Sequence, residues 1–397
     1  MHKVLILGGG KVGKSVAELL LACGRGGYGV TVVDREPDHL REAEANLSRL
    51  RSAAGHAVEF ETRSVNASDR GAVRDALRGH DAVVCMLPFD LVAGVAEIAA
   101  DLGVHYFDVT EDVKATEGVR AVAARGGLRS ALVPQCGLAP GYIAIAAHHV
   151  ARQFDAIHDL TLRVGALPQY PTNALKYNIT WSAAGVVNEY CEPCRVMLEG
   201  ALCAVPALEG LERFSFQGVE YEAFYTSGGV GSLVETLVSE GRTTAHTRVA
   251  YKTIRYPGHR DLMRFLLQDL RLGEADAGAR FNRRVAVELL EHAVPRTLQD
   301  VVVVFVSGVG ERGGRREQIN FMRSIPATTL LGRVWPAIEL TTAAGVCAMV
   351  DLHRLGRLPA AGLVRQEDCT LEMFNATVFG LAYEAPDRLE AAAMARG

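Results

Sequence analysis

The chain has 397 residues, enough for two or three domains, and 49% of them are apolar and 22% charged, as in ordinary globular proteins. A net charge of −4 and a pI near 6.3 exclude a protein-wide nucleic-acid or membrane surface, which would need a broad basic patch. No apolar run reaches the roughly 18 residues of a membrane span, and the eight cysteines are scattered, mostly in apolar runs. This pattern predicts reduced thiols in a cytoplasmic protein.

A glycine-rich turn near the N-terminus predicts a dinucleotide site. Residues 3–7 (KVLIL) are typical of a buried parallel strand, and the GxGxxG of residues 8–13 and a helical pattern follow them. A second strand (GVTVVD) ends on Asp34, 21 residues after Gly13. A lone GxGxxG is a weak signal, but a strand, turn, helix, strand and acid in this order are a strong one.

Each residue of this turn has its own expected role. Gly8 allows the tight turn, Gly10 lets the backbone approach a pyrophosphate, and Gly13 lets the helix pack close to the strand. The helix N-terminus at Lys11 and Val12 offers N–H groups and the positive end of the helix dipole to the phosphates.

Asp34 and Arg35 bear on the choice of cofactor. A carboxylate at Asp34 can accept both ribose hydroxyls of NAD and would repel the 2′-phosphate of NADP. Arg35 comes next and can soften that repulsion. We therefore expect NAD, with NADP as the less favoured cofactor.

Strands and helices continue to alternate after the second strand. Strand patterns occupy 58–65, 81–87, 104–110 and 128–137, and helical patterns occupy 68–79 and 91–103. This alternation predicts a doubly wound parallel sheet, a Rossmann-type domain over residues 1–145, with ligands at the carboxyl ends of the strands. The residues at those ends are Leu87, Pro88, Phe89, Asp108, Thr110, Gln135, Cys136 and Gly137.

The middle of the chain has a different texture. Residues 146–330 contain strand-like segments rich in β-branched and aromatic residues, which predicts an α+β domain with a mixed sheet. Residues 331–397 begin with an apolar, small-residue-rich helix pattern, and we expect this segment to return to the first domain. The overall fold class is therefore α/β with a second, α+β domain.

The stretch YKTIRYPGH at 251–259 places Lys252, Arg255 and His259 around a Pro-Gly turn. One interpretation is a solvated charged loop. The other is a pocket for an anionic substrate, because only arginine binds a carboxylate in a planar, two-pronged way.

Two cysteine features have weaker interpretations. Cys136 is either a small buried apolar residue or a contact to cofactor or substrate, and a nucleophilic thiol there would need a nearby base. The CEPC at 191–194 is a single CxxC without further ligands at usable spacing, so we expect no metal.

Several long stretches together resemble the saccharopine dehydrogenase (saccharopine reductase) family, most closely its compact bacterial members. These stretches are GGGKVG, VVCMLPF, VHYFDVTEDV, VPQCGLAPGYI, VGALPQYPTNALKYNITWS, YEAFYTSGG, KTIRYPGH and GRLPAAGLVRQED. The resemblance implies a Rossmann domain, a substrate and dimerisation domain, a homodimer, and reversible oxidation of a secondary amine by NAD(P).

The resemblance also assigns residues. It places Leu87, Pro88 and Phe89 on the loop at the nicotinamide side. Phe89 is also a candidate for substrate binding, as are Gln135 and Gly137 from their position at a strand end. The resemblance puts Asp108 and Cys136 at substrate-pocket positions, makes Trp181 and Ser182 a substrate-contacting pair, and makes Arg255 the residue that holds a substrate carboxylate. The candidates for catalysis are Asp108, His259, Lys176 and Cys136.

The expected activity is that of a glutamate-forming saccharopine dehydrogenase acting on a small amino acid with several carboxylates. The Trp181-Ser182 pair favours this over the related lysine 6-dehydrogenase, and carboxynorspermidine dehydrogenase stays open. Many fungal relatives have GLDPG where this chain has GLAPG at 137–141, and they prefer NADP. A non-catalytic dinucleotide sensor is the alternative from another class.

Overall fold

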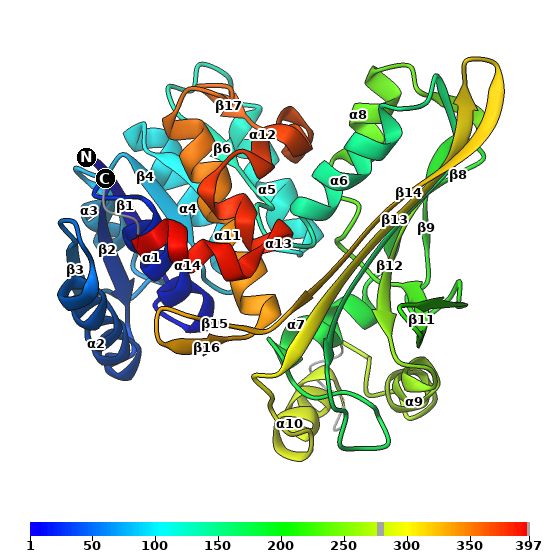
Figure 1. Ribbon diagram of the computed structural model, residues 1–397, viewed down its shortest axis with the longest axis horizontal. Helices are drawn as coiled ribbons and strands as arrows, with labels where there is room; N and C mark the ends of the chain where they lie inside the picture. The colour runs from blue at the N-terminus through cyan, green and yellow to red at the C-terminus, as the bar shows by residue number, and fades with distance from the viewer. Residues whose placement is uncertain (276–281, 395–397) are drawn as a thin grey trace. The chain divides into compact units, whose positions relative to one another are not determined.

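The computed structural model describes residues 1–275 and 282–394, and the chain forms two compact units (Figure 1). The first unit comprises Met1–Tyr142, Thr328–Arg333 and Glu339–Gly397, and the second comprises Ile143–Ala327 and Val334–Ile338.

The first unit is built on a parallel sheet with the strand order β17-β6-β5-β4-β1-β2-β3. Its strands are β1 (His2–Leu7), β2 (Tyr28–Asp34), β3 (Glu59–Ser64), β4 (Ala82–Cys85), β5 (His105–Asp108), β6 (Ala131–Val133) and β17 (Gly362–Leu363). The chain order reverses where β1 pairs with both β2 and β4. In doubly wound sheets this reversal point, at the carboxyl ends of the strands, is where ligands bind.

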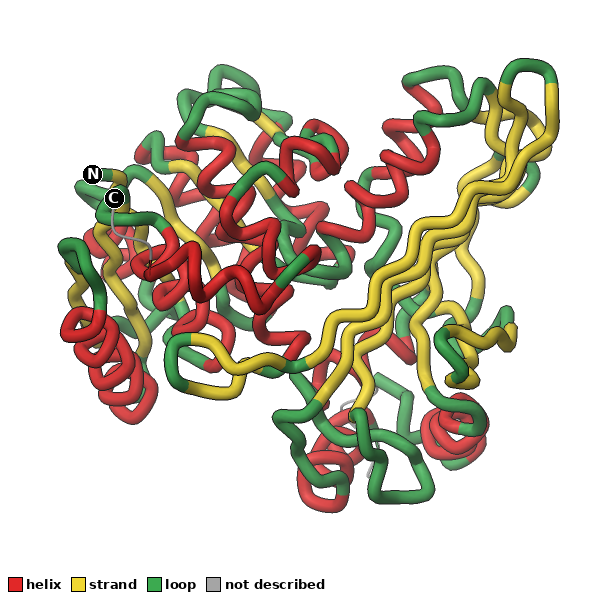
Figure 2. Tube along the Cα trace, in the orientation of Figure 1, coloured by secondary structure: helices red, strands yellow, loops and turns green. Residues whose placement is uncertain are grey.

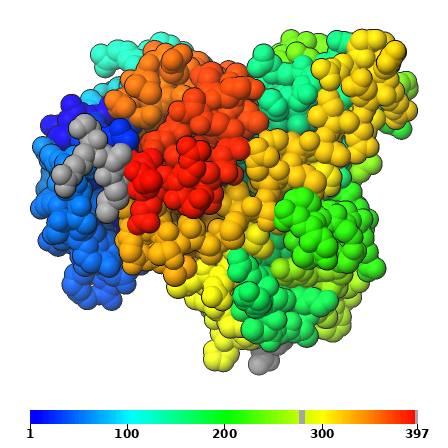
Figure 3. Space-filling view, viewed as in Figure 1, coloured from blue at the N-terminus to red at the C-terminus, as the bar shows by residue number. Residues whose placement is uncertain are grey.

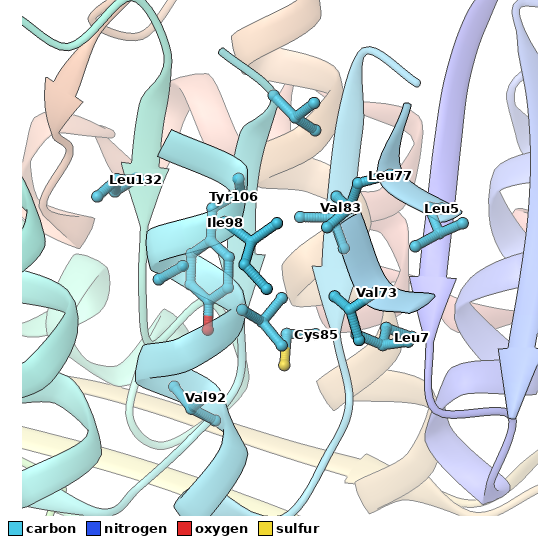
Figure 4. Close-up of a cluster of buried hydrophobic side chains, with 14 of the residues drawn as sticks. Leu5, Leu7, Val73, Leu77, Val83, Cys85, Val92, Ile98, Tyr106 and Leu132 are labelled. Carbon is cyan, nitrogen blue, oxygen red and sulfur yellow. The ribbon is translucent and has the colours of Figure 1, made fainter. Parts of the chain in front are cut away.

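The helices of the first unit cover the sheet. They are α1 (Lys11–Cys23), α2 (Pro37–Ala53), α3 (Arg70–Leu77), α4 (Phe89–Leu102) and α5 (Val113–Ala123). Figure 4 shows part of the core, in which strand residues such as Val83 and Tyr106 meet Val92 and Ile98 of α4. β1, β4 and β6 are apolar because both faces of the sheet are buried there, which is why the sequence shows them as continuous apolar runs, whereas β3 at the edge of the sheet is polar and largely exposed.

The end of the chain returns to the first unit, which confirms the expected helical return. Its elements are β15 (Thr328–Leu330), β16 (Arg333–Trp335), α11 (Ala337–Arg354), a 3₁₀ turn (Gln366–Asp368), α12 (Leu371–Asn375), a 3₁₀ turn (Val378–Gly380), α13 (Leu381–Glu384) and α14 (Pro386–Met394). Tyr383 stacks on Tyr142 at 3.9 Å between ring centroids, and α14 contacts α1. In the space-filling view the red C-terminal residues form part of the surface of this unit (Figure 3).

The second unit contains a mixed sheet with the order β10-β11-β12-β7-β13-β14, and β8 branches off β12 and pairs with β9. The strands are β7 (Ala156–Pro168), β8 (Cys194–Leu198), β9 (Ala201–Val205), β10 (Glu212–Phe216), β11 (Val219–Tyr225), β12 (Thr243–Arg255), β13 (Asp300–Arg312) and β14 (Arg315–Pro326). β12 and β7 run parallel and the other neighbours antiparallel. Figure 2 shows its long strands as yellow tubes running side by side.

The helices of the second unit are α6 (Tyr142–Ala151), α7 (Ala183–Cys191), α8 (Leu233–Ser239), α9 (His259–Arg264), a π-helical turn (Phe265–Asp269) and α10 (Arg283–Ala293). One core cluster joins α7, α10 and the sheet through residues that include Tyr190, Phe224 and Leu290. Within the described residues, no helix is long and apolar enough to cross a bilayer.

Candidate functional site

The glycine turn after β1 lies at the reversal point of the first sheet. Gly8 has φ +111°, and a Cβ there would lie 2.6 Å from Met86 O. A Cβ on Gly13 would lie 1.9 Å from Gly8 O, so the packing of the chain itself requires both glycines. A Cβ on Gly10, in contrast, would meet nothing within 4 Å. The space next to Gly10 therefore fits the close approach of a ligand to the backbone.

The N-terminus of α1 begins at this turn. Gly10 is its N-cap, no side chain caps the helix, and its first turn holds no acidic residue. Lys11 Nζ lies 3.5 Å from Glu339 Oε2, and Lys14 pairs with Glu42. An uncapped helix N-terminus with two lysines in its first turn is suited to a phosphate group.

Asp34 ends β2 beside the glycine turn. Its Oδ2 accepts a hydrogen bond from Gly9 N at 2.7 Å and its Oδ1 accepts one from Glu36 N at 2.9 Å. His39 Nδ1 lies 3.1 Å from Oδ2. Burial opposes ionisation, but these three partners outweigh it and lower the pKa of Asp34, so the group is a carboxylate at neutral pH. The Arg35 guanidinium is largely exposed and pairs with Glu36 at 3.0 Å.

The loop after β4 carries Leu87, Pro88 and Phe89. Leu87 is half-buried against the core, and Pro88 is the N-cap of α4. Phe89 is the first residue of that helix, and its side chain is 46% exposed. An exposed phenylalanine at the carboxyl end of a sheet strand is consistent with a ligand contact.

Asp108 is fully buried at the end of β5. Its Oδ1 accepts hydrogen bonds from Thr110 N and Gln135 N, both at 3.0 Å, and so joins the loops that follow β5 and β6. Its Oδ2 has no hydrogen-bond partner among the described residues. Burial raises the pKa of Asp108 to about 6. Gln135 adopts φ +63°, which fixes the course of the second loop.

Cys136 and Gly137 belong to this loop. Cys136 Sγ donates to Val133 O at 2.8 Å, and Gln366 Nε2 lies 3.7 Å from the same sulfur. Burial raises the pKa of Cys136 well above its usual range, which is the environment of an inert structural thiol. A nucleophilic role for Cys136 therefore finds no support. Gly137 O accepts from Tyr142 N at 2.9 Å.

Arg255 ends β12 in the second unit and is 3% exposed. Its guanidinium carbon lies 5.2 Å from the Tyr177 ring centroid and 5.8 Å from that of Tyr190. Its Nη1 donates to Ile254 O at 2.8 Å, whereas its Nε has no hydrogen-bond partner among the described residues. Glu189 is also buried and adds negative charge near this cation.

The side chains of Lys252 and Arg255 lie on opposite faces of β12. Positions three apart on a strand point to opposite faces, and Lys252 Nζ donates to Gly210 O at 2.7 Å and pairs with Glu212 at 3.1 Å. Tyr256 donates to Pro168 O at 2.9 Å. The basic stretch seen in the sequence is therefore not one cluster: Arg255 faces the rings of Tyr177 and Tyr190, whereas Lys252 Nζ lies 5.1 Å from the ring centroid of Tyr225.

His259 is buried at the start of α9. Its Nδ1 lies 2.9 Å from Leu175 O and its Nε2 lies 3.1 Å from the Tyr190 hydroxyl. Burial lowers the pKa of His259 to about 3, so the ring is neutral at physiological pH. Nδ1–H then donates to the carbonyl and Nε2 accepts from Tyr190. This arrangement positions Tyr190 beside Arg255 and does not favour a proton shuttle.

Lys176, Trp181 and Ser182 are the other site residues that the sequence predicts in the second unit. Ser182 is the N-cap of α7 and accepts from Gly185 N at 3.1 Å. The Trp181 ring packs over Gly185, where a Cβ would lie 2.3 Å from it. Lys176 is exposed, and its Nζ donates to Pro257 O at 2.9 Å.

Sequence reasoning missed Tyr177, Tyr190 and Glu189, which surround Arg255. Tyr177 lies in the loop before α7 and Tyr190 near the C-terminal end of that helix, and neither position carries a signal that separates a ligand-site ring from a core ring. Among the residues that the structure describes, no group of three or more His, Cys, Asp or Glu side chains is placed to hold a metal ion.

Comparisons with known proteins match nearly the whole chain. Residues 4–128 match the saccharopine dehydrogenase NADP binding domain, and residues 137–376 match the saccharopine dehydrogenase C-terminal domain. The chain belongs to the saccharopine dehydrogenase family. The resemblance read from the sequence is thus confirmed, and family membership supports an oxidoreductase with a nicotinamide dinucleotide cofactor.

One solved structure agrees with the fold of this saccharopine dehydrogenase family member. The structure is similar to apo saccharopine dehydrogenase (L-Glu forming) from Saccharomyces cerevisiae, with a TM-score of 0.72 and 17% identity over 96% of this chain and 97% of that one. A DAP dehydrogenase from C. glutamicum, in complex with DAP, matches with a TM-score of 0.46 and 10% identity over 94% of this chain and 96% of that one. The yeast match confirms the α/β fold class.

Proposed function

We propose that this protein is an NAD-dependent saccharopine dehydrogenase of the glutamate-forming type. It would oxidise the secondary amine of saccharopine and hydrolyse the resulting imine to glutamate and 2-aminoadipate 6-semialdehyde. The observation that carries the proposal is the buried Arg255, a permanent cation with an unused donor in a cage of tyrosine rings.

The argument from Arg255 is energetic. A buried ion costs several kcal/mol unless hydrogen bonds and opposite charge compensate it. The rings of Tyr177 and Tyr190 and the nearby Glu189 supply part of that compensation. A substrate carboxylate would supply the rest, because it accepts two parallel N–H bonds from a guanidinium. A substrate with several carboxylates, such as saccharopine, meets this requirement.

The first unit would hold the dinucleotide. The open space at Gly10, the uncapped end of α1 and the ionised Asp34 fit a pyrophosphate and a ribose diol. We propose NAD because the Asp34 carboxylate would repel the 2′-phosphate of NADP. Arg35 offsets little of this repulsion because its guanidinium pairs with Glu36. When bound, the cofactor would supply the acceptor for the hydride that leaves the carbon next to the amine.

Proton transfer is proposed for Lys176. Of the catalytic candidates, Asp108, Cys136 and His259 are buried, and each holds neighbouring groups in place through hydrogen bonds. Lys176 is the candidate whose side chain reaches solvent, and its Nζ lies on Pro257 O in the turn that follows Arg255. A proton acceptor must reach the amine, which favours an accessible nitrogen.

The test is an NADH-absorbance assay with saccharopine, lysine and carboxynorspermidine in separate reactions. The proposal predicts the highest kcat/KM for saccharopine with NAD. Faster oxidation of lysine or carboxynorspermidine would reassign the substrate within the family. Tight dinucleotide binding with no turnover of any amine would instead favour a sensor.

A further inference from the structure

The chain itself already uses most of the hydrogen-bonding capacity of the Asp34 carboxylate. Oδ2 accepts a hydrogen bond from Gly9 N at 2.7 Å and lies 3.1 Å from His39 Nδ1, and Oδ1 accepts one from Glu36 N at 2.9 Å. Asp34 is a carboxylate at neutral pH, and a carboxylate only accepts, so His39 Nδ1 is the donor in its contact. A carboxylate has about four acceptor positions, which leaves one open position, on Oδ1.

One open position is too few for a ribose diol. The ribose of a dinucleotide presents two hydroxyl donors to the acid at the end of the second strand. The open position on Oδ1 can accept one of these hydroxyls, whereas the other needs a position on Oδ2 that the chain occupies. One of the three donors of the chain must therefore leave Asp34 before both hydroxyls can bind it.

His39 is the donor that can leave. Gly9 N and Glu36 N are backbone groups of the glycine turn and of the N-cap of α2, so neither can turn away unless the backbone moves. His39 lies in the first turn of α2, which packs against β2 (Figure 1), and donates through its side chain. That side chain is 43% exposed, whereas the side chain of Asp34 is 12% exposed. A change of rotamer therefore frees Oδ2 and leaves the backbone of the site in place.

A displaced His39 ring has another acceptor close to it. Glu42 lies three residues further along α2, on the same face of the helix. Lys14 and, more weakly, His39 lower the pKa of Glu42, so this carboxylate is a negative charge near the imidazole. The ring can therefore exchange its contact with Asp34 for solvent or Glu42, and the exchange costs no more than about one hydrogen bond.

We propose that His39 limits the preference for NAD by competing with the adenosine ribose for Asp34 Oδ2. It leaves this oxygen when both hydroxyls of the ribose bind, and it stays when the ligand offers a single hydroxyl. NADP carries a phosphate at the 2′ position and offers one hydroxyl, so His39 opposes NAD and not NADP. This inference rests on the dinucleotide site of the proposed function and adds a residue that sets the selectivity of that site.

The test is calorimetric titration of wild type and His39→Ala with three ligands: NAD, NADP, and NAD without its adenosine 2′-hydroxyl. His39→Ala should bind NAD roughly fivefold more tightly, because the diol no longer displaces a donor. The two ligands with one hydroxyl should bind the variant within about twofold of wild type, because the open position on Oδ1 already accepts that hydroxyl. A purely structural role of His39 would shift the affinities for all three ligands together.

Two further variants serve as controls. His39→Gln keeps an N–H donor at this position and should return the NAD affinity to that of wild type. Arg41→Ala removes a cation of the same helix that is exposed and pairs with Asp38, and it should leave all three affinities unchanged. Thermal unfolding without ligand shows whether each variant folds.

The outcomes separate this inference from the proposed function. A wild type that binds no dinucleotide would overturn both. A wild type that binds NAD would overturn the role of His39 alone if His39→Ala bound NAD no more tightly. The role of His39 would also be overturned by an equal gain for NAD and for the ligand without the 2′-hydroxyl.

Discussion

The dinucleotide turn of the first unit and the Arg255 site of the second unit are built in opposite ways. The turn is one continuous stretch that offers backbone groups and open space, with Gly10 as the clearest sign of that space. The Arg255 site is assembled from separated segments around one buried charge, with Tyr177 and Tyr190 beside it. A site made of backbone is damaged by adding atoms, whereas a site made of a buried charge is damaged by removing it.

The largest expected effect comes from Gly13→Ala. The new Cβ would lie 1.9 Å from Gly8 O. Because this oxygen belongs to the backbone, no side-chain movement can relieve the clash. We expect a loss of about 3 kcal/mol or more in the free energy of unfolding, together with loss of dinucleotide binding. Urea denaturation followed by circular dichroism measures the first. Wild-type stability in this variant would show that the turn is not packed as described.

The burial of Asp108 should make the free energy of unfolding depend on pH, by about 3 kcal/mol at most. Its pKa in the fold is about 6, against roughly 3.9 when unfolded, so the fold favours the protonated form. That contribution is complete below pH 4 and is lost as the pH rises through 6. Asp108→Asn keeps the accepting oxygen and cannot ionise, so it should be more stable relative to wild type at pH 7.5 than at pH 4. Equal differences at the two pH values would contradict the burial of this carboxyl.

Gly10→Ala is the matched partner of Gly13→Ala. A Cβ at Gly10 meets no atom of the chain, so the unfolding free energy should change little beyond the ordinary difference between the two residues. The methyl group would occupy the approach of the pyrophosphate, and we expect roughly 30-fold weaker NAD binding, about 2 kcal/mol. Calorimetric titration measures the NAD affinity. An unchanged affinity would show that the cofactor does not bind in the space next to Gly10.

Asp34→Asn should have the smallest effect. The amide keeps an accepting oxygen for Gly9 N but removes the negative charge. We expect the ratio of NADP to NAD affinity to rise roughly tenfold, about 1.4 kcal/mol, because repulsion of a 2′-phosphate is relieved. Dissociation constants for both cofactors on wild type and variant give this ratio. A wild type that already prefers NADP would contradict the assignment of NAD.

The same comparison explains what the sequence could predict. Most of the first sheet was predictable because strands such as β1 are short apolar runs followed by a helix, and its ligand turn is local. The two-residue β17, which joins this sheet from the far end of the chain, has no such pattern. In the second unit, β7 pairs with β13, more than a hundred residues away, and no local pattern gives that pairing. The two faces of β12, which separate Lys252 from Arg255, follow from that sheet. The roles of buried groups such as His259 and Asp108 depend on tertiary partners in the same way.

The most direct test of the central claim is the binding of saccharopine to wild type and Arg255→Gln, with NAD binding measured on the same samples. Glutamine keeps a polar, uncharged side chain at the site, and Arg255→Lys serves as the charged control without the planar fork. We predict that Arg255→Gln weakens saccharopine binding by roughly 100-fold, about 2.7 kcal/mol, with a smaller loss for lysine and unchanged NAD affinity. Equal saccharopine affinity in wild type and Arg255→Gln would contradict the account.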